Sequence, residues 1–145
     1  MKIAIASDHA GFELKELIKK DLSELKLEDL GTYSSDSVDY PDFGIKLAES
    51  VANNTFDRGI VICGSGIGMS IAANKVKGIR AALCQTKEFA ELSRRHNDAN
   101  VLVLSGRFIS HYLAKEIIEI WLSTPFEGGR HQRRIDKISK YELKR

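Results

Sequence analysis

A glycine-rich segment, Cys63-Gly64-Ser65-Gly66-Ile67-Gly68, carries the residue types best suited to chemistry. Three glycines at alternate positions let successive backbone N–H groups turn toward one point at a helix N-terminus, and this geometry holds an anionic oxygen. The segment fails the dinucleotide fingerprint, because Met69 stands where its last glycine is needed, and it fails the P-loop pattern, because no Lys-Ser/Thr pair follows. The pattern therefore predicts an anion cradle and argues against nicotinamide and ATP binding.

Cys63 stands at the mouth of this predicted cradle. A helix N-terminus favours an ionised thiol, so Cys63 is a candidate thiolate base or nucleophile. The alternative is ordinary packing, since free cysteine is among the most buried residue types, and position alone leaves both interpretations open. Cys84 lacks a cradle and is predicted to be a core residue. Neither cysteine has a paired spacing with histidine, which argues against disulfides and a zinc site and favours a cytoplasmic location.

Polar side chains also follow two other hydrophobic runs, at residues 3–7 and 101–104. Asp8 and His9 come after the first run, and Arg107 comes after the second. Asp8 can cap the following helix and can also transfer a proton, and these two roles are compatible. His9 at a helix start suits binding of phosphate or hydroxyl groups. Arg107 can hold phosphate, because the guanidinium fork matches phosphate oxygens.

The C-terminal segment contains Arg130 and Arg134, which lie one helical turn apart if the segment is helical. On a common face, the two guanidinium groups can bind one phosphate. The alternatives are a solvated basic helix and a nucleic-acid surface, and the second is disfavoured because interleaved aromatic residues are missing. The pattern leaves open whether Arg133 and His131 also touch a ligand.

His96 and Asn97 lie near the end of the helix that precedes the hydrophobic run at 101–104. That end of a crossover helix should lie far from the carboxyl ends of the strands, where parallel sheets bind their ligands. If these residues take part in catalysis, the simplest arrangement is an isologous dimer in which His96 reaches the pocket of the neighbouring subunit. Otherwise His96 complements the helix dipole.

Hydrophobic patterning predicts the elements that position these residues. Strands are expected near residues 3–7, 27–30, 59–63, 79–84 and 101–104, and helices near 14–25, 43–51 and 69–74, from 87 onward, near 113–121 and as a short C-terminal segment. Their alternation implies a parallel sheet covered on both faces. The expected fold is a three-layer α/β domain, Rossmann-like or flavodoxin-like, with five parallel strands spanning residues 1–145. The irregular stretch 31–42 is a candidate functional loop.

Composition narrows the classes of function. The 145 residues are 43% hydrophobic and 29% charged, which suits one globular domain. A formal net charge of +2 supplies no strong field for nucleic acid or an anionic membrane. No stretch approaches the length of a membrane span, and no secretion signal is recognised. A small-molecule ligand is therefore expected, with neither nucleic acid nor membrane as a partner.

Six segments together resemble ribose-5-phosphate isomerase type B and its relatives, which include allose- and galactose-6-phosphate isomerases. The segments are SDHAGF at 7–12, DYPDF at 39–43, ICGSGIGMSIAANK at 62–75, GIRAALC at 78–84, SRRHNDANVL at 93–102 and EGGRHQRR at 127–134. The similarity spans nearly the whole chain, and the motifs occur in family order. It implies a Rossmann-like homodimer, sometimes paired into tetramers, with active sites shared between subunits and no metal or cofactor.

The resemblance also implies a mechanism. Asp8 and His96 would assist opening of the sugar ring, and Cys63 would then remove the C2 proton to form a cis-enediolate. The amides of the glycine segment would stabilise this intermediate, with Ser65 as a proton shuttle and Asn97 bound to the enediolate or its hydroxyls. The implied remaining contacts are Tyr40 with the sugar and His9, Arg107, Arg130 and Arg134 with the phosphate.

Some family members use a glutamate base on the helix after the glycine segment. Ala72 or Ala73 occupies that position here, so the chain resembles the branch that uses Cys63. One alternative is the same isomerisation of a six-carbon sugar phosphate. Another is a non-catalytic module that binds a phospho-sugar, which would need the cradle but no thiol. The sequence leaves open the five- or six-carbon preference, and whether the assembly is a dimer or a tetramer.

Overall fold

The computed structural model describes residues 1–144, which form a single α/β domain. Its five parallel strands are β1 (Ile3–Ser7), β2 (Glu28–Asp29), β3 (Arg58–Cys63), β4 (Ala81–Leu83) and β5 (Val101–Ser105). Its helices are α1 (Phe12–Asp21), α2 (Tyr40–Ala52), α3 (Ile67–Asn74), α4 (Lys87–Arg95), α5 (His111–Ser123) and α6 (Arg130–Glu142), with a short 3₁₀ turn, η1 (Ser23–Leu25). The expected five-stranded parallel α/β fold is confirmed.

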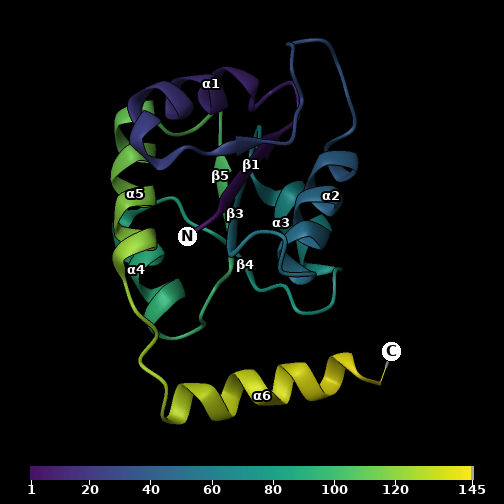
Figure 1. Cartoon of the computed structure of the whole chain (residues 1–145), viewed down its shortest axis with the longest axis vertical. Helices are drawn as coiled ribbons and strands as arrows, with labels where there is room; N and C mark the ends of the chain where they lie inside the picture. The colour runs from purple at the N-terminus through teal and green to yellow at the C-terminus, as the bar shows by residue number, and fades with distance from the viewer. Residues whose placement is uncertain (145) are drawn as a thin grey trace.

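Two apolar layers sandwich the sheet, because alternate strand residues point to opposite faces. Helices α1, α4 and α5 cover one face, and α2 and α3 cover the other (Figure 1). Ile60 and Ile62 of β3 pack on the first side, while Val61 and Cys63 pack on the second. The continuous burial of β1, β3 and β5 is typical of parallel strands covered on both faces.

The strand order is β2-β1-β3-β5-β4, so the last strand in the chain lies inside the sheet and β4 forms an edge. A flavodoxin-like sheet has the order 2-1-3-4-5, and the chain departs from it at these last two positions. Pairing of β3 with β5 in register places Cys63 beside Ser105. The residues that follow β5 therefore lie next to the glycine segment that follows β3.

Several elements differ in length from the sequence expectation. The strand expected at 27–30 is only Glu28–Asp29, and the helix expected at 14–25 ends at Asp21, after which η1 and Lys26, with a φ of 50°, turn the chain. Strand β4 is shorter than expected, at Ala81–Leu83, and just before it the Arg80 backbone N–H donates to the Asn100 side chain at 2.8 Å. On its outer edge, the Asn74 side chain binds the backbone N–H and carbonyl of Ala81. Helix α6 is longer than expected, at 13 residues.

Helix α6 crosses the end of the domain where the strands begin (Figure 1). It buries only His131 and Ile135. Ile138 and Tyr141 on the same helix are more than half exposed. Among residues 1–144, no helix is long and apolar enough to span a membrane.

A buried lysine anchors β2 to α1. Lys15 has no exposed surface, and its Nζ lies 2.5 Å from Asp29 Oδ2, while Lys19 Nζ lies 2.8 Å from the same oxygen. Asp29 Oδ1 accepts the Gly31 N–H at 2.9 Å. Burial raises the pKa of Asp29, but the hydrogen bonds from Lys15, Lys19 and Gly31 outweigh burial and hold that pKa below its ordinary value. The start of the 31–39 loop is thereby fixed.

Replacing Asp29 with asparagine should lower the free energy of unfolding at pH 7 by about 3 kcal/mol, because the buried Lys15 charge loses its partner. Since the folded pKa of Asp29 is lowered, its stabilisation is present above the ordinary value of 3.8 and is lost as the pH falls through the folded pKa. Urea unfolding at pH 7 and pH 3 should therefore show the difference from the wild type shrinking in acid. Asp36→Asn, at an exposed aspartate of the same loop, is the control. An equal loss in both variants would contradict the prediction.

Candidate active site

A cavity opens beyond the carboxyl ends of β1 and β3. The chain places its next strands on opposite sides of this pair, and open parallel sheets bind their ligands at such a switch point. The volume of the cavity is about 430 Å³. Three loops supply most of its walls, those that follow β1, β3 and β5. The lining residues are Asp8, His9, Ala10, Tyr40, Cys63, Gly64, Ser65, Gly68, Arg107 and Phe108. The chain thus brings together most of the residues that the sequence singled out at the carboxyl ends of the strands.

The glycine segment forms a tight turn into α3. Gly66 is the N-cap residue with a φ of 81°, a conformation that strongly favours glycine. A Cβ at Gly66 would also lie 2.5 Å from the Leu83 side chain. Ser65 Oγ accepts the Ile67 N–H at 3.2 Å, so that N–H already has a partner, and the Ile67 side chain is exposed and lies outside the cavity lining. The other N–H groups of the turn are those that can bind an anionic oxygen.

Tyr40 forms one wall of the cavity from the first turn of α2. A Cβ at Gly68 would lie 2.6 Å from the Tyr40 ring, so the absence of a side chain at Gly68 lets the ring pack against the start of α3. Pro41 follows Tyr40 in the first turn of α2, where its missing N–H costs nothing. The ring therefore stands beside the glycine turn and forms part of the cavity wall.

The two cysteines have different surroundings. Cys63 is only 5% exposed and packs with the core on the α2–α3 side, yet it also lines the cavity at the end of β3. Cys84 is 1% exposed and lies in the other core layer, where burial raises the pKa of its thiol to about 11. The prediction that Cys84 is a core residue is confirmed. Both thiols are free.

Asp8 and His9 enter the cavity from the loop after β1. Asp8 Oδ1 accepts the Gly11 N–H at 3.0 Å, which braces the turn that leads into α1, and Asp8 also lines the cavity. The N-cap residue of α1 is Gly11, so Asp8 is not the helix cap itself. His9 Nδ1 lies 3.1 Å from the Val38 nitrogen and 3.2 Å from the Val38 carbonyl oxygen. The Val38 backbone therefore fixes the orientation of the His9 ring and ties the 31–39 loop to the site.

Arg107 reaches the cavity because β5 lies beside β3. The Gly106 N–H donates to the Cys63 carbonyl at 2.8 Å, and the Arg107 N–H donates to the Gly64 carbonyl at 3.1 Å. A Cβ at Gly64 would lie 3.1 Å from Arg107 Nη1, so the guanidinium lies directly against the glycine segment. Within residues 1–144, Arg107 forms no ion pair. It is available for an anionic ligand.

The other predicted site residues lie at the opposite end of the domain. His96 is the C-cap residue of α4, Asn97 follows it, and Arg130 and Arg134 lie in the first half of α6, across the end where the strands begin (Figure 1). Neither arginine is buried, and neither forms an ion pair with another described residue. One chain therefore does not bring these four residues to the cavity. The sequence predicts this separation for His96 and Asn97, which end a crossover helix, but not for Arg130 and Arg134.

His96, Glu127 and His131 form a cluster at this second location. Their nearest ligand-type atoms lie within 4.8 Å of one another, and the two imidazole rings stack with centroids 4.2 Å apart. Burial, together with the charges of His96, Arg130 and Arg134, holds the pKa of His131 below its ordinary value. Glu127 Oε1 lies 3.6 Å from Arg95 Nε and 3.5 Å from His96 Nε2, so the carboxylate of the cluster already has cationic neighbours.

A second cavity, about 620 Å³, lies between α6 and the β4 edge of the sheet and is larger than the one beside the glycine turn. Its apolar lining includes Ile79, Ile135 and Ile138, and Asn97 is also among its lining residues. It contains neither cysteine nor any residue of the glycine segment. This larger cavity therefore lacks the thiol and the main-chain donors that make the cavity at the glycine turn the candidate active site.

A family model described as Ribose/Galactose Isomerase matches residues 3–138. The chain belongs to the ribose/galactose isomerase family. Ribose-5-phosphate isomerase B of Escherichia coli strain K12 is 48% identical over 146 aligned residues, which cover 99% of this chain and 98% of that protein. The family resemblance of the six sequence segments is therefore confirmed.

Solved structures of the ribose/galactose isomerase family have the same fold. A ribose-5-phosphate isomerase B of Clostridium thermocellum is 53% identical with a TM-score of 0.96, and the alignment covers 99% of each chain. The Mycoplasma genitalium ribose-5-phosphate isomerase B, solved with bound ribulose-5-phosphate, is 47% identical with a TM-score of 0.93, covering 99% of this chain and 97% of that one. The sheet order of this chain is therefore that of a family fold, not a local irregularity.

Sequence reasoning missed three contributors to this isomerase-family cavity: Ala10 and Phe108, which line it, and Val38, which holds His9. Phe108 lines it and is 70% exposed, and its position directly after Arg107 was a usable signal. Val38 holds His9 through its backbone alone, 29 residues away in the chain, and a backbone contact of this kind leaves no signal in the residue type. Ala10 and Phe108 thus follow residues that the sequence singled out, whereas Val38 lies in a loop that only the tertiary structure places.

Proposed function

We propose that this chain interconverts ribose 5-phosphate and ribulose 5-phosphate through a cis-enediolate, with Cys63 as the base. The observation that carries the proposal is that Cys63, the glycine turn and Asp8 line one cavity. A base, a set of main-chain donors and a second acid–base group are what proton transfer between adjacent carbons needs. The E. coli and M. genitalium relatives named above support ribose 5-phosphate as the substrate.

In the proposed reaction, Asp8 and His96 assist ring opening, which frees the C1 aldehyde. The Cys63 thiolate then takes the C2 proton, and the electron pair of the broken C–H bond forms the C1–C2 double bond while negative charge moves to O1. Backbone N–H groups of the glycine turn stabilise that charge. Ser65 moves a proton from O2 to O1, Asn97 binds the enediolate hydroxyls, and Cys63 returns its proton to C1, giving the ketose. No metal or cofactor takes part.

The phosphate would be held at the far end of the substrate. His9 and Arg107 border the cavity of their own chain. Arg130 and Arg134 carry exposed guanidinium groups one helical turn apart, a spacing that suits bidentate contacts to one phosphate. Tyr40 would lie along the sugar carbons.

We infer that the active unit is a homodimer in which each pocket takes His96, Asn97 and the α6 arginines from the partner. Three observations support this inference. First, the cavity residues and the group of His96, Asn97 and the α6 arginines lie at opposite ends of the domain. Second, Ile67 and Ile71 beside the glycine turn are 57% and 58% exposed. Third, α6 leaves most of its apolar side chains uncovered. An isologous interface would cover these surfaces and complete both pockets at once. Pairing of dimers into a tetramer is compatible with this arrangement.

The proposal extends to the whole chain and its location. Residues 1–145 would act as one sugar-phosphate isomerase domain. A thiolate base requires a compartment that keeps cysteine reduced, which favours the cytoplasm. The alternatives are isomerisation of a six-carbon sugar phosphate and binding of a phospho-sugar without turnover. The thiol beside the glycine turn favours catalysis over simple binding.

Converting Arg134 to alanine tests both the activity and the phosphate contact. The wild type should convert ribose 5-phosphate to ribulose 5-phosphate, and Arg134→Ala should raise KM about tenfold or more while kcat changes little, because one charge-assisted hydrogen bond is lost. Lys140→Ala, at an exposed cation of the same helix, is the control. Allose 6-phosphate is assayed beside ribose 5-phosphate. An unchanged KM would reject the contact, and no turnover of either sugar would reject the function.

A further inference from the structure

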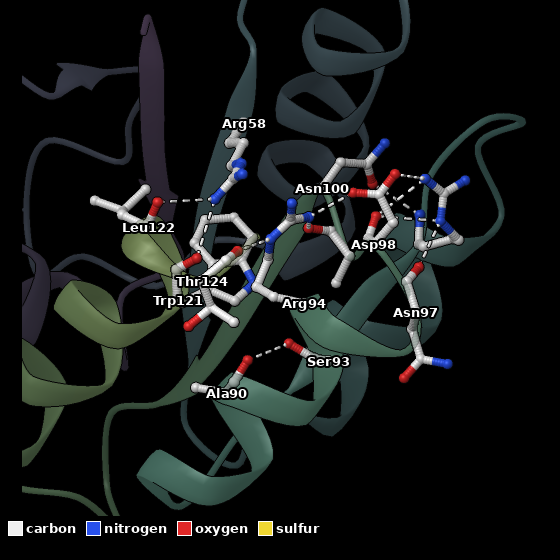
Figure 2. Close-up of polar contacts among 12 residues, drawn as sticks. Arg58, Ala90, Ser93, Arg94, Asn97, Asp98, Asn100, Trp121, Leu122 and Thr124 are labelled. Atoms are coloured by element: carbon white, nitrogen blue, oxygen red, sulfur yellow. Dashed lines mark hydrogen bonds and ion pairs between the residues drawn. The ribbon is translucent and has the colours of Figure 1, made fainter. Parts of the chain in front are cut away.

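The backbone after α4 is held by two arginines from different elements. Arg80, just before β4, donates from Nε to the Asn97 carbonyl at 2.8 Å and from Nη2 to the Asp98 carbonyl at 3.0 Å. Arg94, within α4, donates from Nη1 to Asp98 Oδ1 at 2.8 Å and to the Ala99 carbonyl at 2.7 Å (Figure 2). Three consecutive residues are therefore fixed from two sides.

Asp98 is the centre of this arrangement. Its φ is 47°, a conformation that aspartate and asparagine adopt more readily than other side chains. One carboxylate oxygen contacts Arg94, and the other lies 3.5 Å from Arg80 Nη2. Asn100 adds a further link, because its Oδ1 accepts the Arg80 backbone N–H at 2.8 Å. The turn between α4 and β5 is thus preorganised by charge-assisted bonds.

The same arrangement leaves the Asn97 side chain free. The backbone carbonyl of Asn97 accepts the hydrogen bond from Arg80. Figure 2 shows the side-chain amide of Asn97 on the opposite side, pointing away from the other residues drawn. Asn97 is exposed, and no hydrogen bond within residues 1–144 engages its amide. A polar amide held by its own backbone, with no internal partner, is presented for contact outside its chain.

We propose that Arg80 is a positioning residue for the isomerisation: by holding the Asn97 and Asp98 carbonyls, it fixes the Asn97 amide where the partner subunit's enediolate forms. The inference rests on the proposed function, which assigns Asn97 to that intermediate. Arg80 itself does not touch the substrate. Its side chain is 25% exposed, whereas that of Arg94 is 6% exposed, so Arg80 can be changed with less damage to the core.

A double-mutant cycle on the full-length protein tests this inference. Arg80→Ala should lower kcat by roughly ten- to a hundredfold, because misplacing a group that contacts the transition state by about 1 Å has effects of that size. KM should change by less than about twofold, since the phosphate contacts are untouched. In an Asn97→Ala background, Arg80→Ala should cost less than about twofold, because the group that it positions is already gone. Arg80→Lys, which keeps the charge but lacks the rigid planar fork of the guanidinium, should recover part of the loss.

Arg58→Ala is the matched control. Arg58 also holds backbone carbonyls at a helix end, those of Trp121 and Leu122 at the end of α5, but it makes no contact with Asn97. It should lower the unfolding temperature and leave kcat unchanged. If Arg80→Ala fails to fold, the cycle is run with Arg80→Lys.

The outcomes separate the inference from the proposed function. If Asn97→Ala lowers kcat but the Arg80 effect is absent, or is the same with and without Asn97, the positioning role is wrong and the proposed mechanism stands. If Asn97→Ala leaves kcat unchanged, the role of Asn97 in the mechanism is wrong, and the positioning role falls with it. Loss of the Arg80 effect in the Asn97→Ala background supports both.

Discussion

Replacing Cys63 with alanine or serine should reduce isomerisation by roughly a thousandfold or more, since a base in direct contact with the migrating proton is lost. Ribose 5-phosphate incubated with the wild type in deuterated water should yield ribulose 5-phosphate with deuterium at C1. Both variants should lose this incorporation together with turnover. Serine preserves the size of the side chain, but its hydroxyl is far less acidic than a thiol, so shape and chemistry are separated.

Cys84→Ala provides the matched control for this experiment. Cys84 is as buried as Cys63 but lies in the other core layer and does not line the cavity. Its removal should lower the free energy of unfolding and leave deuterium incorporation intact. Full exchange by folded Cys63→Ala, measured by mass spectrometry and circular dichroism, would remove Cys63 from the mechanism. Retained turnover without exchange from solvent would instead indicate a shielded proton transfer and would contradict the exchange pattern expected here.

Mixing two inactive variants should restore activity if the pockets are shared between subunits. Cys63→Ala removes the base from one side of a pocket, and His96→Asn removes the ring-opening group supplied by the other side. A dimer with one chain of each kind has one pocket with both defects and one intact pocket. An equal, random mixture should therefore recover about one quarter of the wild-type rate, because half of its dimers are mixed and each has one good pocket of two.

The mixing experiment requires that the subunits exchange, so the variants are unfolded and refolded together. Mass measurement of differently tagged chains shows whether mixed dimers have formed. Each variant refolded alone is the control and should stay inactive. Mixed dimers without activity would mean that Cys63 and His96 do not serve the same pocket, and a monomer with full wild-type activity would overturn the shared site altogether. Either result would leave the family membership of the chain untouched.

Much of the site was readable from the sequence because its signals are local. The glycine turn is encoded in six consecutive residues, where alternate glycines permit the positive φ at Gly66 and the close packing of Tyr40 against Gly68. Asp8 and Arg107 were found because each lies within two residues of the end of a buried strand, and the carboxyl ends of parallel strands share one edge. The periodicity of hydrophobic residues also predicted the number of strands and helices and their order along the chain.

Other parts of the site depend on contacts between residues distant in the chain. The hydrogen bonds from Arg80 to Asn97 and between His9 and Val38 span 17 and 29 residues, and neither residue type reveals its partner. The full burial of Lys15 is equally hidden, since lysine is ordinarily exposed and only the nearby Asp29 makes its burial tolerable. A charged residue with a buried partner looks, in the sequence, like any surface charge.

The sequence by itself determined the type of fold, the glycine turn at the start of α3 and the separation of His96 from the cavity of its own chain. Only the tertiary structure decided that β5 lies between β3 and β4, which places Arg107 against Gly64. Local patterns specify that a segment is a buried strand, but each of the three longest strands is buried on both faces and can pair with any of the others. The order of the strands is set by the packing of the whole sheet and its helices, a sum of non-local contacts that no short segment encodes.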